Sequence, residues 1–295
     1  MKEQPKSKWP IIIIVLLGLY ILASFFSGLI ALATGGVKPT GNVAVIPVTG
    51  TILTGQGGFL EGVAVSGEIV DQIQEAKDNA DIKAIILMID SPGGAPVASR
   101  EIATAIATTN KTTVAWIRES GASGAYWIAS ATDYIIADPL SITGSIGVIG
   151  SYLDFSGLMT HYNVSYERLV GGQFKDTGIP YRELSPEERR MLQKKIDLMH
   201  QAFKDAVAKN RHLSRNQIDS IATGEFYLGS EAKSLGLVDD LGGEPEALSY
   251  IERTQNITAE PVIYQYEPSF KELLSQLMSK WSPRIEVSGM QASLT

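Results

Sequence analysis

The sequence predicts an α/β protein with a mainly parallel sheet of βαβ units, a helical C-terminal extension and one N-terminal transmembrane helix. Three observations lead to this expectation. Short β-branched runs alternate with segments of helical periodicity between residues 42 and 137, which is the pattern of βαβ units. After residue 185 the periodicity becomes helical. The first 37 residues contain a long stretch without charge.

Residues 1–37 predict a cytoplasmic stub and a membrane anchor. Ile11–Ala33 is an apolar stretch of 23 residues, and as a helix it would be about 35 Å long, enough for a hydrocarbon core of about 30 Å. Three lysines precede it and one follows closely, so the positive-inside rule puts the N-terminus in the cytoplasm and residues 38–295 outside. Ala31-Leu32-Ala33 is similar to a signal-peptide cleavage site, so a cleaved signal peptide remains the alternative, although the stretch is long for one.

Residues 38–260 predict one α/β domain. The apolar and β-branched runs indicate strands at Asn42–Val48, Lys83–Asp90, Thr112–Ile117, Tyr134–Ala137 and Val164–Leu169. Lys83–Asp90 is almost continuously apolar, as is typical of a strand buried on both faces. Helical spacing indicates helices at Ser66–Asn79, Pro96–Thr109 and Ser123–Ser130.

The clearest helix start is Ser185–Glu188, where a serine N-cap is followed by a proline and two acids. We expect this helix to reach Asn210, and shorter helices to follow at Arg215–Ile221, Ser230–Leu235 and Glu244–Arg253. Residues 261–295 form the expected C-terminal extension, in which Phe270–Trp281 has the spacing of an amphipathic helix.

Composition and charge exclude several classes of protein. The 295 residues include no cysteine, which excludes disulfide scaffolds, Fe–S clusters and cysteine peptidases. The net charge is −7, and −9 without residues 1–37, so nucleic acid is a poor partner. No HExxH or Walker A pattern occurs, and we expect neither a metal nor a cofactor. The histidines are His161, His200 and His212, and no G-x-S-x-G motif supports a Ser–His–Asp triad.

Three glycine-rich junctions carry the candidate chemistry. Asp90–Gly94 follows a buried strand, at the strand end where open α/β sheets bind ligands, and its two glycines allow a sharp turn with bare amides. Ser120–Tyr126 places small residues around Ser123 at the start of a helix, and Gly171–Asp176 contains Lys175. Taken alone, each junction is typical of an ordinary turn between a strand and a helix, and a single lysine in a loop is usually solvated.

Taken together, the junctions offer the parts of a Ser–Lys dyad. Ser123 is a candidate nucleophile and Lys175 a candidate base, with the amides of Gly94 and Gly124 as donors to a developing oxyanion and Ser145 as a hydroxyl that orients the amine. A lysine needs desolvation to act as a base near neutral pH, because its ordinary pKa is about 10.4.

Five motifs in order resemble the signal peptide peptidase SppA family of serine–lysine membrane peptidases. Asp90–Gly94 is similar to the family's (N/D)SPGG turn, and Ala122–Tyr126 is similar to its A-S-G-G-Y nucleophile segment. The other three motifs are Leu140–Val148, similar to L-T-G-S-(I/L)-G-V, Gly172–Asp176, similar to G-x-x-K-D, and the glycine pattern of residues 223–242. The resemblance covers most of residues 40–245.

The resemblance implies a ClpP/crotonase-like fold over residues 38–260 and a serine endopeptidase that hydrolyses membrane-associated peptides such as remnant signal peptides. It implies Ser123 as nucleophile, Lys175 as general base and Ser145 as the residue that positions the lysine. The amides of Gly94 and Gly124 would form the oxyanion hole. Ala125 stands where the family has a second glycine, and we expect its methyl group to narrow the floor beside the nucleophile.

The chain also resembles the half-length form of the family, because it has no tandem repeat. This form is expected to assemble into membrane-seated homo-oligomeric rings in which neighbouring protomers supply the serine and the lysine. We therefore expect Ser123 and Lys175 to lie beyond hydrogen-bond reach within one chain. Two alternatives stay open: a catalytically inactive membrane-anchored scaffold of the same fold, and a crotonase-like acyl-CoA enzyme, against which the outward topology counts.

Overall fold

A computed structural model describes residues 8–34, 40–55 and 62–264, in two units, Met1–Thr40 and Gly41–Thr295. The first unit contains α1 (Trp9–Thr34), in which the side chains of Trp9 and of residues 12–28 are described. Over the residues so described, no helix has both the length and the apolar character needed to cross a membrane. The expected transmembrane helix is therefore not confirmed.

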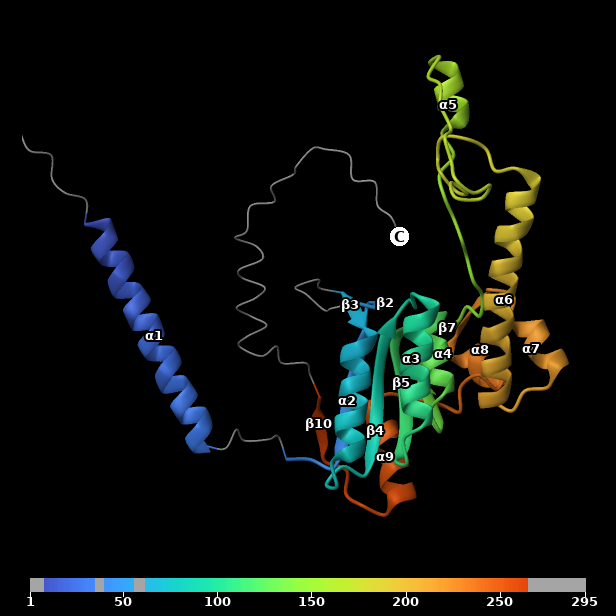
Figure 1. Ribbon diagram of the computed structural model, residues 1–295. Coiled ribbons are helices and arrows are strands. Elements are labelled where there is room, and N and C mark those ends of the chain that lie inside the picture. Colours follow the sequence, from blue (N-terminus) through green and yellow to red (C-terminus); the bar gives the residue numbers. More distant parts are fainter. Residues whose placement is uncertain (1–7, 35–39, 56–61, 265–295) are drawn as a thin grey trace, which may run out of the picture. The chain divides into compact units, whose positions relative to one another are not determined.

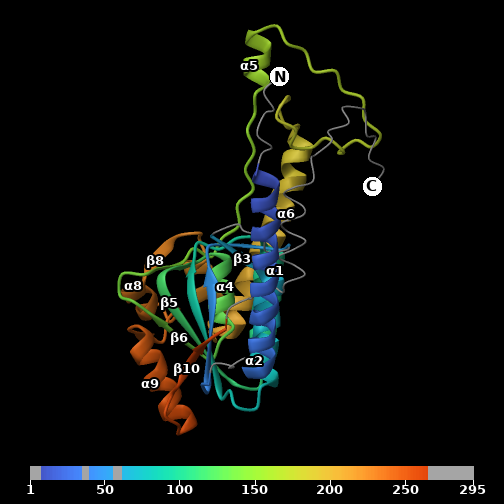
Figure 2. The ribbon, with the colours of Figure 1, turned by 90° about the vertical axis from the view of Figure 1, so that its left-hand side faces the viewer.

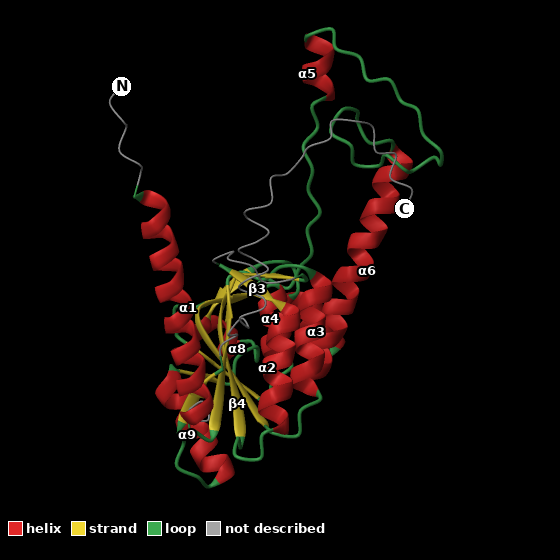
Figure 3. Cartoon of the chain, turned by 60° about the vertical axis from the view of Figure 1, so that its left-hand side comes forward, coloured by secondary structure: helices red, strands yellow, loops and turns green. Residues whose placement is uncertain are grey.

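The second unit is built on an eight-stranded sheet with the order β10-β1-β4-β5-β6-β9, to which β7 and β8 are added beside β5 (Figure 1, Figure 3). Every pair in it is parallel except β7–β8, which confirms the expected mainly parallel α/β sheet. The strands are β1 (Val43–Thr49), β4 (Ala84–Ser91), β5 (Thr112–Ala122), β6 (Tyr134–Ala137), β7 (Ile142–Gly144), β8 (Phe226–Leu228), β9 (Asp240–Leu241) and β10 (Pro261–Ile263). A separate pair joins β2 (Thr51–Leu53) and β3 (Val63–Val65).

The helices of the second unit follow the expected periodicity closely. They are α2 (Ser66–Asp78), α3 (Pro96–Ala107), α4 (Gly124–Ser130), α5 (Ser156–His161), α6 (Pro186–Asn210), α7 (Arg215–Ile221), α8 (Gly229–Ser234) and α9 (Glu244–Gln255). The long helix α6 starts at a capping box, in which the Glu188 amide donates to Ser185 Oγ and the Ser185 amide donates to the Glu188 carboxylate. The capping signal in the sequence therefore set the start of α6.

Both faces of the central strands are buried, against different partners. One face packs on α2, α3, α4 and α6 and includes Leu87, Ile102 and Phe203. The other face forms a smaller core with α9, around Ile86 and Ile251, and Figure 2 shows α9 at the lower end of the sheet. Burial on two sides explains why the sequence of β4 is almost continuously apolar.

Three expectations need correction. Val164–Leu169 is not a strand; it lies in residues 150–185, an arm that projects beyond the sheet (Figure 1, Figure 2) and offers it no strand to pair with. Strand β5 continues five residues past Ile117, because β7 pairs with Ser120–Ala122. Pro261–Ile263, expected in the C-terminal extension, pairs with β1 as a sheet strand. Phe270–Trp281 lies outside the described residues.

The fold predicts a stability cost for removing one buried hydroxyl. Tyr126 is fully buried and its hydroxyl donates to the Leu237 carbonyl at 2.7 Å. Tyr126→Phe leaves that carbonyl without its partner and should lower the free energy of unfolding by about 1–2 kcal/mol in urea titrations. Tyr152→Phe, at an exposed ring, is the matched control, and an equal effect of both variants would contradict the assignment.

Candidate active site

The turn after β4 depends on Gly93. Its φ of +100° suits glycine, and a Cβ there would lie 2.8 Å from the Ala122 carbonyl oxygen, the Gly124 nitrogen and the Ser123 Cβ. The turn is held from below by Ser91, whose hydroxyl donates to the Gly50 carbonyl at 2.6 Å and accepts from the Gly93 amide at 3.1 Å. The first glycine-rich junction therefore rests directly against the second.

The Gly94 amide N–H points away from β2, and its nitrogen lies close to Gly124. Ile52 donates to the Gly93 carbonyl at 2.9 Å and accepts from the Ala95 amide at 2.7 Å. Because the amides of a strand alternate in direction, these two bonds turn the Gly94 N–H to the other side. A Cβ on Gly124 would lie 3.3 Å from the Gly94 nitrogen, so the two predicted donors are neighbours.

Ser123 is the single residue between β5 and α4. Its φ of 53° and ψ of −123° lie outside the regions that side chains prefer, and such strain is held by the surroundings. The Ser123 amide donates to the Gly144 carbonyl at 2.9 Å, and its carbonyl accepts from the Trp127 amide at 3.0 Å. The next amide, of Gly124, is at the first position of α4, where no carbonyl within the helix can accept it.

Four of the five predicted site residues line one pocket. Ser123, Ser145, Gly94 and Gly124 border a cavity of about 320 Å³. Ser145, with a φ of 49°, is fixed through its amide, which donates to the Glu225 carbonyl at 2.8 Å, and its hydroxyl donates to Gly224 at 3.3 Å. The arrangement combines a hydroxyl at a strained junction with two amides, which suits attack on a carbonyl and stabilisation of its oxyanion.

Apolar side chains complete the pocket, and sequence reasoning missed them. Trp127 and Phe203 line it and stack with ring centroids 4.8 Å apart, and Val148 and Ile149 also border it. Trp127 lies four residues after Ser123, and this helical spacing could have placed its side chain beside Ser123. Phe203 comes from α6, and the apolar periodicity of that helix indicated only that Phe203 belongs to the core.

Ala125 does not narrow the floor of the pocket as expected. Its methyl group is fully buried in the main core and does not belong to the residues that border the cavity. The departure from the A-S-G-G-Y segment therefore leaves the space beside Ser123 unchanged.

Lys175 lies apart from Ser123. It is exposed, in a turn where its amide donates to the Gly172 carbonyl, and it belongs to the arm beside the start of α6 (Figure 1). The pocket at Ser123 is bordered by Phe203, farther along the same helix. Glu188 and Phe203 are separated by about 22 Å along the axis at about 1.5 Å per residue. Among the hydrogen bonds of the described residues, none joins Ser123 to Lys175.

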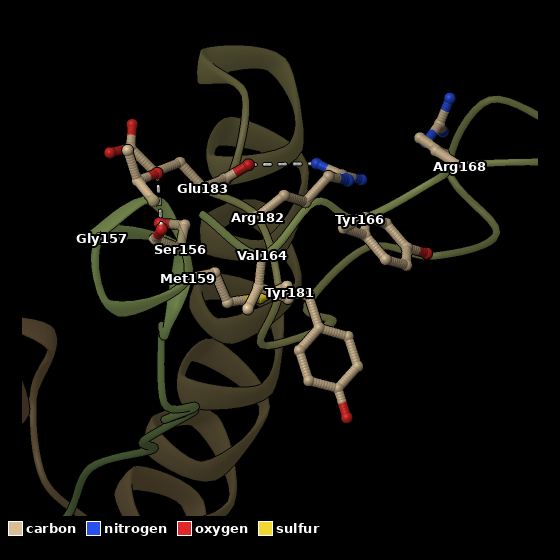
Figure 4. A pocket seen from close by; sticks show the side chains of 10 residues that line it. Ser156, Gly157, Met159, Val164, Tyr166, Arg168, Tyr181, Arg182 and Glu183 are labelled. Atoms are coloured by element: carbon tan, nitrogen blue, oxygen red, sulfur yellow. Dashed lines mark hydrogen bonds between the residues drawn. The ribbon is translucent and has the colours of Figure 1, made fainter. Parts of the chain in front are cut away.

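A network of charges holds the turn that carries Lys175. Asp176 accepts from Arg168 Nε at 2.7 Å and from Arg182 Nε at 3.1 Å. Arg182 also donates to Glu188, which accepts from Thr177 as well. Figure 4 shows Arg182 and Arg168 at an adjoining cavity within the arm, between α5 and residues 164–183, which has a volume of about 400 Å³. The arm therefore has its own internal framework.

The arginines hold the carboxyl groups of this network ionised. The guanidinium groups of Arg168 and Arg182 keep the pKa of Asp176 well below its usual range. Arg182, followed by the Ser185 amide, does the same to the pKa of Glu188. Across the described stretches of the chain, no cluster of three or more His, Asp or Glu residues has the arrangement of a metal site.

Comparisons with known proteins identify relatives over the same region. The model of peptidase family S49 matches residues 105–258, which include Ser123, Ser145 and Lys175. A protein of Methanocaldococcus jannaschii is 35% identical over 67% of this chain and 64% of its own length. Protease 4 of Haemophilus influenzae is 33% identical over 72% of this chain and 35% of its length. The chloroplastic serine protease SPPA of Arabidopsis thaliana is 31% identical over 73% of this chain and 32% of its length. The chain thus spans less than two thirds of these three relatives.

The contact between the two junctions predicts different outcomes for two glycine substitutions. Gly93→Ala meets backbone atoms at a positive φ, whereas the Cβ of Gly124→Ala meets Ser99 Oγ at 2.2 Å. Both should destabilise the fold by about 1–3 kcal/mol, because the core is closely packed. Ser99→Ala should recover stability in Gly124→Ala and none in Gly93→Ala, as measured by urea unfolding. Equal recovery in both backgrounds would show that the described contacts are wrong.

The charge network predicts that the arm loosens in acid. Because the folded-state pKa values of Asp176 and Glu188 are depressed, their stabilisation is complete above the ordinary carboxyl pKa of about 4 and is lost as the pH falls below it. Hydrogen exchange, corrected for the intrinsic rate at each pH, should show residues 168–188 losing protection there before the residues around Phe203. Simultaneous loss along the whole of α6 would contradict a local network.

Proposed function

The chain belongs to peptidase family S49, the SppA family, and on that premise we propose that it is a membrane-anchored serine endopeptidase with a Ser123–Lys175 dyad. The observation that carries the proposal is the pocket in which Ser123 meets the adjacent amides of Gly94 and Gly124. Acyl transfer needs a nucleophile, such as a hydroxyl group, and hydrogen-bond donors that stabilise the oxyanion, such as a pair of amides.

In the proposed reaction, Ser123 Oγ attacks the carbonyl carbon of the scissile peptide bond and gives its proton to the neutral Lys175 amine. The carbonyl oxygen becomes an oxyanion that accepts hydrogen bonds from the Gly94 and Gly124 amides. The C–N bond then breaks, and the protonated lysine returns the proton to the leaving amine. Water attacks the resulting ester with the same lysine as base, which releases the acid and restores Ser123.

We assign the lysine of each site to a neighbouring protomer. Support comes from the separation of Lys175 from the Ser123 pocket within one chain and from the apolar side chains that the arm exposes. Leu169 is more than nine-tenths exposed, and Leu153, Leu158 and Tyr162 are also exposed. An apolar surface of this kind is typical of a contact with another protein. A head-to-tail contact that closes into a homo-oligomeric ring would bring one arm to the next pocket and exclude water from its lysine.

The proposed substrates are peptides in or near the membrane, including remnant signal peptides. The pocket of about 320 Å³ beside Ser123 is bordered by Trp127, Val148 and Phe203, so it favours small or apolar side chains of the substrate. The membrane anchor is supported by the stretch Ile11–Ala33 and its preceding lysines. In this topology the N-terminus is cytoplasmic and the peptidase domain is outside the cytoplasm.

The rival hypothesis of a catalytically inactive scaffold depends on Ala125, which stands where the family has a second glycine. Its methyl group is buried in the core and does not border the Ser123 pocket, so Ala125 does not support this hypothesis. The acyl-CoA alternative shares only the oxyanion turn and has no observation in its favour.

Mixed assembly tests both the dyad and its distribution over two protomers. Ser123→Ala and Lys175→Ala should each abolish cleavage of a fluorogenic peptide by the detergent-solubilised full chain, whereas Lys195→Ala, at another exposed lysine, should not. When the two inactive variants are produced together, about a quarter of the sites in a random ring would pair an intact serine with an intact neighbouring lysine. We therefore expect partial recovery of activity.

The outcomes of this test separate the parts of the proposal. Full activity of either single variant would refute the dyad. Loss in both single variants with no recovery in mixed rings would refute the shared site while keeping the dyad. A wild-type oligomer whose Ser123 fails to react with a serine-directed fluorophosphonate would favour the scaffold.

A further inference from the structure

One face of the sheet is only partly covered by the described chain. On β1, β4 and β5 the residues that face α2, α3 and α4 are completely buried, among them Ile46, Leu87 and Ile117. On the opposite face, the lower residues are covered by α9, but Pro47, Met88 and Trp116 above them are only half-buried. These three residues are partners in register across the strands, so they form one continuous row.

A fourth apolar residue lies on the edge strand, on the same face but one row lower. Ile263 of β10 pairs with Val45 of β1, which puts it on the same face as Pro47, two positions lower, and its side chain is 56% exposed. We call Pro47, Met88, Trp116 and Ile263 the apolar band. Its upper border is polar, since Arg118 is exposed and lies over the Trp116 ring at 5.6 Å from the centroid. An apolar row with a polar border, on the inner strands of a parallel sheet, is unusual without a covering element.

The chain itself supplies a segment that matches the band. The last described residue, Tyr264, follows Ile263 directly and donates through its amide to the Val45 carbonyl at 2.9 Å. Residues 270–281 then carry apolar side chains at helical spacing: Phe270, Leu273, Leu274, Leu277, Met278 and Trp281. Ser269 and Glu272 have the spacing of a capping box, and Pro283 follows as a stop signal.

We propose that the apolar face of residues 270–281 docks on the apolar band of the same chain and covers this part of the sheet. The dimensions agree. A helix of this length is about 18 Å long, and the four strands from β10 to β5 extend over about 14 Å at about 4.8 Å per strand. The residues between Ile263 and Phe270 reach up to about 20 Å when extended, so they connect the edge of the band to any point on it.

The tether favours this occupant over a second copy of the chain. Only six residues connect the segment to Ile263, which is itself part of the band, so the effective concentration of the segment at the band is in the millimolar range, as for other short linkers. A separate copy would have to compete at its ordinary concentration. The docked segment would bury the half-exposed Met88 and Trp116, whose apolar area stabilises the contact at roughly 25 cal/mol per Å².

Disulfide trapping tests the proposal in the full-length, detergent-solubilised protein, and the absence of native cysteine makes each introduced pair unique. Met88→Cys is combined in turn with Leu274→Cys and with Leu277→Cys on the apolar face. The matched control pairs Met88→Cys with Ser279→Cys, which lies on the opposite face of the same helical pattern. Under mild oxidation, an apolar-face pair should close within one chain several-fold faster than the control pair. Equal rates for all pairs, or disulfides only between two chains, would overturn the proposal.

Labelling of Met88→Cys alone by a maleimide gives a second measurement without cross-linking. In the otherwise unchanged chain the thiol should react several-fold more slowly than one at the exposed Thr49→Cys. Adding Leu274→Asp and Leu277→Asp should raise the Met88→Cys rate several-fold, whereas Ser275→Asp and Ser279→Asp should leave it unchanged. If Met88→Cys reacted as fast as Thr49→Cys in the otherwise unchanged chain, the proposal would be overturned. Slower labelling that appears only after phosphatidylcholine vesicles are added would also overturn it, because the occupant would then be lipid.

Discussion

The backbone contact between the Gly93 turn and the Ser123 junction is the constraint on which the site depends. The two segments follow neighbouring parallel strands, and the register of β4 and β5 shifts between Ile89 and Ser91, so that Ser91 pairs with Gly121. The two turns lie so close together that a Cβ on Gly93 would be 2.8 Å from atoms of Ala122, Ser123 and Gly124, so only glycine is tolerated there. Main-chain bonds that join Ile52 to Gly93 and Ala95, together with the Ser91 hydroxyl, hold the turn that carries the Gly94 amide.

Ser123 and Lys175, the proposed nucleophile and base, are held in place by separate parts of the structure. The sheet, α4 and the β7–β8 pair fix Ser123 and Ser145. The turn that carries Lys175 is instead held by Arg168, Asp176 and Arg182 of the arm and by Glu188 of α6. A site shared between protomers requires this separation, because each half has to keep its shape before the other arrives. The arginine partners depress the pKa values of Asp176 and Glu188, so both carboxyl groups are ionised near neutral pH.

The sequence predicted what local periodicity and motif spacing determine. The buried strands, the capped α6 and the small residues around Ser123 were all visible in it. Strands such as β2, β7 and β8 were not, because three residues carry no periodicity and their pairing partners decide their conformation. The stacking of Trp127 on Phe203 joins distant segments, and the bonds of Arg182 follow no spacing rule. Val164–Leu169 has the composition of a strand but does not form one, because it has no neighbouring strand in the arm to pair with.

The parallel direction of the strands also sets the distance between the start of the sheet and the Ser123 junction. The chain enters the sheet at Val43, and Ser123 stands at the opposite, carboxyl end of the strands. Parallel strands of seven or eight residues are about 25 Å long. The entry of the chain into the sheet at Val43 and the Ser123 junction are therefore separated by the full length of the strands.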